Sequence, residues 1–215
     1  MKKIISFSLY GWEGKYTVGM LCNVELAKII YPDWICRIYY GNSVNKYFID
    51  ELKKHENVEL VRKIEKPNKS SMMWRFLPID EPDVEVMISR DADSRLSWRE
   101  KKCVDIFLES DKLLHSIRDE VNHNNIMGGM WGIKKNNRIK IKNLIKKWEG
   151  GDVYGSDQNF VREVIEPKFI DSYIIHCSKY LGTFPQIEAE NKYNFFVGMV
   201  FPEDNYIRPY DYIFY

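Results

Sequence analysis

Asp91 and Asp93 are the residues of this chain whose type and spacing point most directly to chemistry. They follow residues 84–89, an apolar, β-forming run that predicts a buried strand. Both carboxylates should therefore emerge at the carboxyl edge of a sheet, where open α/β sheets bind ligands. Such a pair suits Mg²⁺ or Mn²⁺, which take oxygen ligands and leave positions open for the phosphate oxygens of a diphosphate. A structural alternative is that Asp93 or Ser94 caps a helix that starts near Trp98.

The segments around this pair alternate between strand-like and helix-like patterns, which indicates an α/β domain with a parallel sheet. Before the aspartates, β-forming runs are separated by runs with helical spacing, at residues 4–10, 18–31, 34–40, 44–55, 58–61 and 84–89. After them we expect helices at 98–109, 139–148 and 156–165 and extended segments at 113–117, 128–134 and 172–176. No linker and no repeat period divides the chain, so the sequence predicts a single domain.

The composition excludes several classes of protein. With 215 residues, 45% hydrophobic and 29% charged, the chain matches a globular protein and not a disordered or coiled-coil one. Its 32 Lys and Arg against 31 Asp and Glu give a net charge of +1, which provides no global field for a nucleic acid partner.

The cysteines and the apolar runs bear on the location of the protein. The four cysteines lie far apart without a Cys-x-x-Cys pair, which argues against a zinc knuckle or a disulfide framework and favours reduced thiols. No secretory signal and no apolar run of about 20 residues is found. We therefore expect a cytoplasmic protein, bacterial or in a host cell, with no transmembrane segment.

A nucleotide-sized βαβ half precedes the aspartate pair, and further motifs follow at Gly128–Gly132, Asp157-Gln158 and His176. This order of motifs resembles the GT-A fold nucleotide-sugar glycosyltransferases. Within that fold the pattern is similar to glycogenin, to the bacterial lipopolysaccharide galactosyltransferases and to the small glycosyltransferase domains of large algal viruses. The resemblance implies one GT-A domain over residues 1–215, a Rossmann-like α/β/α sandwich with a mostly parallel central sheet. Residues 1–93 would bind the nucleotide and residues 94–215 the sugar and acceptor.

The same resemblance implies a metal site and a sugar pocket. Asp91 and Asp93 would hold Mn²⁺ or Mg²⁺, with Asp91 also touching the ribose, and His176 would be the third protein ligand. Read without the family, a histidine at a strand end is a structural hydrogen-bonding residue. Asp157 and Gln158 would face the transferred hexose; the alternative for them is an exposed first helical turn favoured by the helix dipole.

Other residues would bind the rest of the donor. In the family, the position of Gly128 and Gly129 lets the backbone approach the donor sugar, although the usual asparagine is displaced here to position 124 or 125; the alternative is a turn that needs glycine for its dihedral angles. Arg75 would meet the diphosphate, unless it forms a surface ion pair. The loop after the first strand sits where the family binds the base, and it offers three aromatic residues that could stack on a pyrimidine: Tyr10, Trp12 and Tyr16.

For three further groups of residues, the sequence is compatible with two roles each. Arg90 and Arg95 could neutralise phosphate or balance the two aspartates. The basic residues within 134–147 form a solvated helix face or a contact with an anionic acceptor or a membrane surface. Asp119 or His123 could position an acceptor hydroxyl, and no spacing argument selects between them.

These motifs predict metal-dependent transfer of a hexose from a nucleoside-diphosphate sugar to a glycan or glycoprotein acceptor. UDP-hexose is the favoured donor. One alternative is a phosphohydrolase of the haloacid dehalogenase type, which also uses Asp-x-Asp after a strand but places it at the first strand. Another is a noncatalytic carbohydrate-binding or degenerate transferase domain, which the 14% aromatic content supports.

Overall fold

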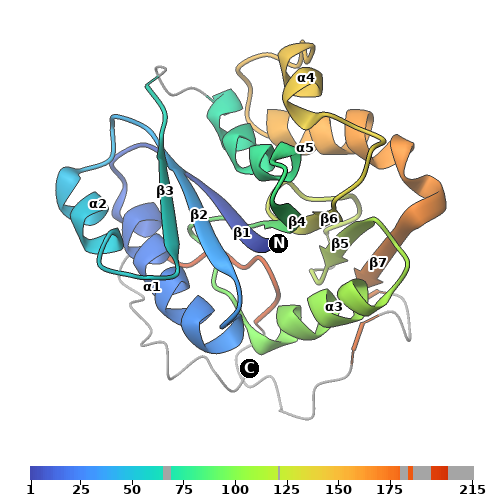
Figure 1. Ribbon diagram of the computed structural model, residues 1–215, viewed down its shortest axis with the longest axis horizontal. Coiled ribbons are helices and arrows are strands. Elements are labelled where there is room, and N and C mark those ends of the chain that lie inside the picture. Colours follow the sequence, from blue (N-terminus) through green and yellow to red (C-terminus); the bar gives the residue numbers. More distant parts are fainter. Residues whose placement is uncertain (65–68, 121, 180–183, 186–194, 203–215) are drawn as a thin grey trace.

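The computed structural model describes residues 1–64, 69–120, 122–179, 184–185 and 195–202. Its centre is a seven-stranded sheet with the strand order β3-β2-β1-β4-β6-β5-β7 (Figure 1). The expected single α/β domain with a mostly parallel sheet is confirmed. Among the helices within the described residues, none has the length and apolar character needed to cross a membrane.

The first half of the chain is a regular βαβ array. Its elements are β1 (Lys2–Leu9), α1 (Gly14–Ile30), β2 (Ile35–Tyr40), α2 (Lys46–Leu52) and β3 (Val58–Arg62). β1 pairs in parallel with β2 on one side and with β4 (Val84–Ser89) on the other, where Ser6 lies opposite Ser89. The carboxyl ends of β1, β2 and β4 therefore meet at one edge of the sheet, and the aspartate pair follows β4 there.

The second half adds the antiparallel strand β6 (Trp131–Lys134), which lies between β4 and β5 (Leu114–Arg118). β7 (Tyr173–Cys177) pairs in parallel with β5 at the outer edge. The strand expected at 128–134 begins only at Trp131, because residues 128–130 form a turn beside the aspartates. The remaining elements are η1 (Lys69–Asp80), α3 (Trp98–Glu109), α4 (Ile141–Lys146), α5 (Ser156–Phe160), η2 (Val161–Ile165), η3 (Glu166–Lys168) and η4 (Ile170–Ser172).

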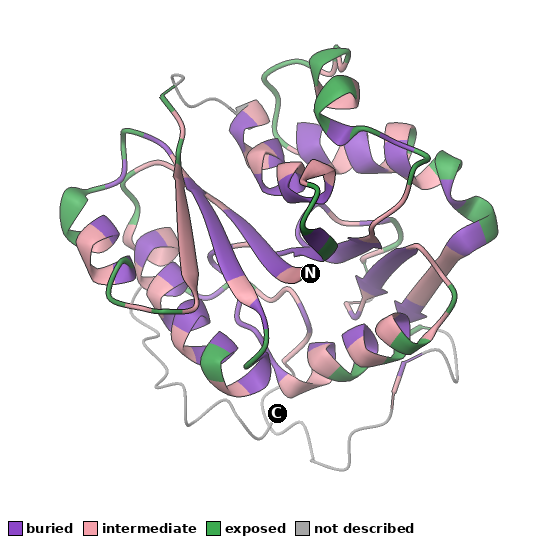
Figure 2. Cartoon of the chain, viewed as in Figure 1, coloured by how far each residue is buried: buried purple, intermediate pink, exposed green. Residues whose placement is uncertain are grey.

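Helices cover both faces of the sheet, as the strand periodicity requires. Ile5 and Phe7 of β1 pack into the core beneath α1 and α3, whereas Ile4 packs into the core beneath η1 and α5. β4 divides in the same way, with Val86 and Ile88 on the first face and Met87 on the second. Figure 2 shows the central strands buried between helices whose outer turns are exposed. The expected α/β/α sandwich is therefore observed.

Candidate functional site

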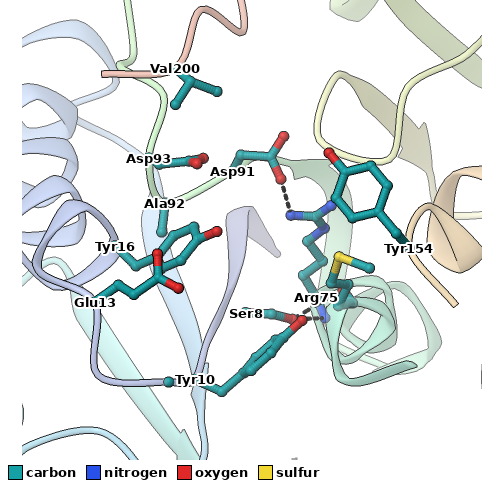
Figure 3. A pocket seen from close by; sticks show the side chains of 12 residues that line it. Ser8, Tyr10, Glu13, Tyr16, Arg75, Asp91, Ala92, Asp93, Tyr154 and Val200 are labelled. Carbon is teal, nitrogen blue, oxygen red and sulfur yellow. Dashed lines mark hydrogen bonds and ion pairs between the residues drawn. The ribbon is translucent and has the colours of Figure 1, made fainter. Parts of the chain in front are cut away.

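A hollow of about 320 Å³ opens at the carboxyl edge of the sheet, where Asp91 and Asp93 follow β4 (Figure 3). The loop after β1, the first turn of α1 and the middle of η1 line it together with the aspartates, and Tyr154 and Val200 complete its rim. This is the location that the sequence predicts for the aspartate pair.

A second hollow of about 140 Å³ shares Met72, Arg75, Asp91 and Tyr154 with the first, so the two are contiguous. Its other lining residues come from the second half of the chain and include His123, Gly128, Gly129, Asp157 and Gln158. We call the first the nucleotide-side hollow and the second the sugar-side hollow, after the predicted roles of their residues.

Arg75 connects the two hollows. Its Nη1 lies 2.5 Å from Asp91 Oδ1 and its Nη2 lies 2.7 Å from Asp157 Oδ2. Burial would lower the pKa of Arg75, but the two carboxylates outweigh burial and raise that pKa. Arg75 and Asp157 are both buried, with 4% of each residue exposed. The alternative of a surface ion pair for Arg75 is therefore excluded. The alternative of an exposed helical turn is likewise excluded for Asp157.

Gly128 and Gly129 give this network the space it needs. A Cβ on Gly128 would lie 2.3 Å from Asp157 Oδ2, and one on Gly129 would lie 1.9 Å from Asp91 Oδ2. The φ angle is not the constraint, because neither residue is among the glycines with positive φ. The turn is held to β4 by a 2.7 Å hydrogen bond from the Ser89 hydroxyl to the Gly128 carbonyl. The two glycines are therefore needed for close approach to the acidic side chains.

The loop that carries the aspartates is fixed from both sides. From α1, the Asn23 amide donates to the Ser94 carbonyl at 2.8 Å, and its oxygen accepts from the Leu96 backbone N–H at 3.0 Å. From the C-terminal side, the Phe201 backbone N–H donates to the Asp93 carbonyl at 2.8 Å. The helix-cap alternative is wrong, since Ser97 caps α3 by accepting from the Glu100 backbone N–H.

The two carboxylates suit a divalent cation. Burial and the neighbouring Asp91 raise the pKa of Asp93, which means that the pair carries unfavourable negative charge a cation would relieve. Oxygen ligands of this kind match Mn²⁺ and Mg²⁺. Within the described residues no group of three potential metal ligands comes together.

His176 does not join the aspartates. It lies on β7, outside both hollows, with its Nδ1 2.8 Å from His115 Nε2 on β5. Burial lowers the pKa of His176 to about 4, and burial together with His176 lowers the pKa of His115 well below its usual value. In this arrangement the two histidines form a buried neutral pair that packs on Phe107 and Phe184.

Of the three aromatic residues expected in the loop after β1, Tyr10 and Trp12 lie in that loop, whereas Tyr16 lies in the first turn of α1. Tyr10 and Tyr16 line the nucleotide-side hollow, and the Tyr10 ring contacts Trp74 edge-on at 6.0 Å. Trp12 is 86% exposed and does not line either hollow.

Several charged residues have structural partners. Arg90 is buried and its Nε lies 3.1 Å from Glu100, which also accepts from the Tyr31 hydroxyl, so Arg90 balances charge inside the protein. Arg95 is buried against the Phe201 ring. Asp119 forms a two-point ion pair with Arg99 at 2.7 Å.

The basic cluster of residues 134–147 is only partly a helical face. α4 is shorter than the helix expected at 139–148 and exposes Lys142 and Lys146. Arg138 instead pairs with Asp171 through both guanidinium nitrogens.

Sequence reasoning missed Tyr154 and Asn23. Tyr154 is 89% exposed and lines both hollows, at the tip of a loop between Gly151 and Gly155, two glycines with positive φ. An aromatic residue between such glycines is the signal that could have identified it. Asn23 gave no such signal, because its partners lie about 70 residues away in the sequence.

No family profile and no curated protein matches this sequence. Among solved structures, the chain is similar to a glycosyltransferase involved in the glycosylation of the major capsid of PBCV-1, with a TM-score of 0.54 and 17% identity over 84% of each chain. It is similar to residues 1–349 of S. aureus TarS in complex with UDP, with a TM-score of 0.54, 12% identity and coverage of 81% of this chain and 57% of that one. It is also similar to the mannosyltransferase PcManGT from Pyrobaculum calidifontis in complex with GDP-Man and Mn²⁺. That similarity has a TM-score of 0.55 and 13% identity, and it covers 82% of this chain and 54% of that one.

The chain spans little more than half the length of the last two proteins. At these identities the similarity establishes the fold, which is the GT-A fold, as the motif order predicts. The reaction has to be argued from the site.

Proposed function

We propose that this protein transfers a hexose from a nucleoside-diphosphate sugar, most suitably a UDP-hexose, to a glycan or glycoprotein acceptor with the aid of Mn²⁺ or Mg²⁺. The observation that carries the proposal is the Asp91–Arg75–Asp157 network. It joins a hollow beside the Asp91 and Asp93 carboxylates to a hollow lined by glycines and hydrogen-bonding side chains. A nucleoside-diphosphate sugar has the same order: a base at one end, an anionic diphosphate in the middle and a sugar at the other end.

Each part of the donor has a matching group. Tyr10 and Tyr16 offer aromatic faces for the base in the nucleotide-side hollow. Asp91 and Asp93 would hold the divalent ion, and Asp157 and Gln158 would receive hydroxyls of the hexose in the sugar-side hollow. The predicted division into halves fits this, because residues up to 93 dominate the first hollow and later residues the second. Neighbours that bind UDP, or GDP-Man with Mn²⁺, support the donor class.

The chemistry follows from where charge develops. Cleavage of the bond between the sugar and the diphosphate leaves negative charge on the phosphate and positive charge at the anomeric carbon. When bound, the divalent ion would supply a Lewis acid for the leaving diphosphate. Arg75 adds a fixed cation beside it, and the buried Asp157 carboxylate lies on the side of the sugar. These charges are arranged before reaction and would stabilise the transition state more than the bound donor.

The proposal includes a cytoplasmic location and no nucleic acid partner. All four cysteines are buried thiols, which is consistent with a reducing compartment. The net charge of +1 supplies no global field that would attract the phosphates of a nucleic acid.

Two alternative functions were considered from the sequence, a phosphohydrolase and a noncatalytic carbohydrate-binding domain. The GT-A fold removes the basis for a haloacid dehalogenase-type phosphohydrolase, because the aspartates follow the fourth strand of the chain and not the first. A noncatalytic carbohydrate-binding domain would share the hollows but would not turn over a donor.

The deciding experiment is a screen of UDP- and GDP-sugars for hydrolysis and transfer, in Mn²⁺ and in chelator, with NMR of the products. We expect Mn²⁺-dependent release of nucleoside diphosphate from a UDP-hexose. Binding of nucleotide sugars without turnover across the panel and a range of acceptors would instead support the noncatalytic domain.

A further inference from the structure

His123 is a titratable residue at the sugar-side hollow for which the proposed function has no use so far. It lines this hollow together with Gly128, Asp157 and Gln158, and it does not line the nucleotide-side hollow. Its ring lies edge-on to Phe196 at 5.7 Å, which fixes the ring on one side. The imidazole is thus located where the sugar and the acceptor would meet.

The ring nitrogens of His123 form no hydrogen bond within the part of the chain that the structure describes. Its Nδ1 is shielded from solvent and has no partner there, and the polar contact of this residue is made by its backbone N–H, which donates to the Glu120 carbonyl. A buried polar atom without a partner is costly unless a ligand or water supplies one. The imidazole is therefore not committed to a hydrogen-bond partner among the described residues.

The other titratable groups lining the sugar-side hollow are already engaged or unsuited to take a proton. Asp91 and Asp157 both accept hydrogen bonds from Arg75, at 2.5 Å and 2.7 Å. Arg75 is a cation and Tyr154 a phenol, and neither type of group acts as a base at neutral pH. Asp119, the other candidate from the sequence, lies outside the hollow and is occupied by Arg99 and by the Val197 backbone N–H.

We propose that His123 is the catalytic base that removes the proton from the acceptor hydroxyl, an inference that rests on the proposed function. The acceptor oxygen forms a bond to the anomeric carbon while the bond from that carbon to the diphosphate oxygen breaks. The bonding electron pair leaves with the diphosphate, and the hydroxyl proton moves to the imidazole, which becomes imidazolium. A base that serves an incoming acceptor opposite the leaving group gives a product with inverted anomeric configuration.

The charged surroundings of His123 suit this role. Burial lowers its pKa, and the nearby Glu120 and Asp119 partly oppose that effect. The ring is therefore neutral at pH 7 and able to accept a proton. Arg75 and Asp157 share the hollow as a neutralised pair, and on the flanking chain Arg118 and Lys179 are bound to Asn124. After proton transfer, the two acidic neighbours would stabilise the imidazolium.

The test uses Mn²⁺-dependent hydrolysis of UDP-glucose or UDP-galactose, whichever the donor screen selects, with water as the acceptor. Proton NMR at early times identifies the anomer that the wild-type protein releases first. The pH dependence of kcat/KM is measured for the wild type and for His123→Gln. His55→Gln is the matched control, because His55 faces Glu25 away from both hollows. UDP affinity is measured by calorimetry for all three proteins.

We expect the wild type to release the β-anomer first from these α-linked donors and to lose activity as the pH falls below about 6.5. His123→Gln should lower turnover by about 100-fold or more, the usual contribution of a general base, and remove the acid limb of the profile. Its UDP affinity should not change, and His55→Gln should behave as wild type.

Two results would overturn the inference alone: first release of the α-anomer, or a His123→Gln variant with the wild-type rate and acid limb. The anomer measurement needs no variant, so it decides the matter even if His123→Gln fails to fold. A wild-type protein that consumes no nucleotide sugar overturns the proposed function and this inference together.

Discussion

Arg75 and the three acidic side chains around it, Asp91, Asp93 and Asp157, determine the charge distribution of this site. Asp91 and Asp157 each pair with the guanidinium, whereas burial and the repulsion of Asp91 raise the pKa of Asp93 by more than Lys15 and Arg75 lower it. The charges on the sugar side of the site are therefore paired, whereas the aspartate pair lacks enough positive charge to balance it.

Asp93→Asn should abolish Mn²⁺-dependent UDP binding without lowering the thermal midpoint of the ligand-free protein. The amide removes a metal ligand but also removes repulsion from Asp91, and the hydrogen bond from Phe201 goes to the Asp93 backbone, which is retained. Calorimetry with UDP in Mn²⁺ and in chelator, together with thermal melts, measures both effects. Asp50→Asn on α2 is the surface control. Unchanged Mn²⁺-dependent UDP binding by Asp93→Asn would contradict the metal assignment.

Asp157→Asn and Gln158→Ala should each reduce transfer by about 10²-fold, the usual cost of losing one transition-state contact, while UDP affinity stays near wild type. The reason is that both residues line the sugar-side hollow and not the nucleotide-side one. Steady-state kinetics with the selected donor and calorimetry with UDP separate the two quantities. Near wild-type turnover in both variants would show that the hexose binds elsewhere.

Among the structural elements, the turn at residues 128–130 and the β5–β7 pair decide which side chains can reach the site. The turn replaces the start of an expected strand and brings backbone against two acidic side chains. The β5–β7 pair lies at the far edge of the sheet, with β6 and β5 between β7 and β4.

Gly129→Ala should weaken Mn²⁺-dependent UDP binding, because the added Cβ would lie 1.9 Å from Asp91 Oδ2 and must displace that carboxylate. The Mn²⁺ concentration needed for half-maximal UDP binding is the measurement. The variant should stay folded, since the neighbouring atoms belong to a side chain that is partly exposed. An unchanged Mn²⁺ requirement would mean that the position of Asp91 does not matter to the ion.

His176→Ala separates the family-derived ligand role from the packing seen on β7. The structure predicts a loss of about 1–3 kcal/mol in the free energy of unfolding, from the lost bond to His115 and the lost packing. The Mn²⁺ dependence of UDP binding should be unchanged. The opposite result, normal stability with a raised Mn²⁺ requirement, would identify His176 as a metal ligand that reaches the site in another arrangement.

At the level of the whole molecule, buried histidines make the stability of the fold depend on pH. The pKa of His176 is lowered to about 4 and that of His115 lies well below 6.5, so the unfolded chain binds more protons than the folded one at acid pH. The stabilisation is complete above about 6.5 and is lost as the pH falls toward 4.

Denaturant unfolding of the wild type should accordingly show a falling free energy of unfolding from pH 6.5 to pH 4, by up to about 1.4 kcal/mol per pH unit for each histidine. His115→Gln keeps a hydrogen-bonding group opposite His176 but cannot be protonated. The slope should therefore be smaller in this variant, and His55→Gln should retain most of it. Equal slopes in His115→Gln and wild type would show that the pair does not cause the acid sensitivity.

The sequence by itself determined the alternation of strands and helices and the position of Asp91 and Asp93 at the carboxyl edge of the sheet. These follow from local hydrophobic periodicity and from the parallel connection of successive βαβ units, which brings strand ends to one edge. The motif order added the expected GT-A fold, which the similarity to solved structures confirms. The roles of Asp157, Gln158, Gly128 and Gly129 remain proposals, although these residues do line one hollow beside Asp91.

Only the tertiary structure decided the partners of the remaining side chains. Arg75 meets Asp157 across 82 residues of sequence, and Asn23 meets Ser94 across 71, distances over which no periodicity in the sequence can specify a contact. A histidine at a strand end reaches the site only if the strand is central and the residue faces the right way, and side-chain direction alternates at every residue. β7 is an edge strand and His176 meets His115 there, whereas His123, in a loop without regular periodicity, lines the sugar-side hollow.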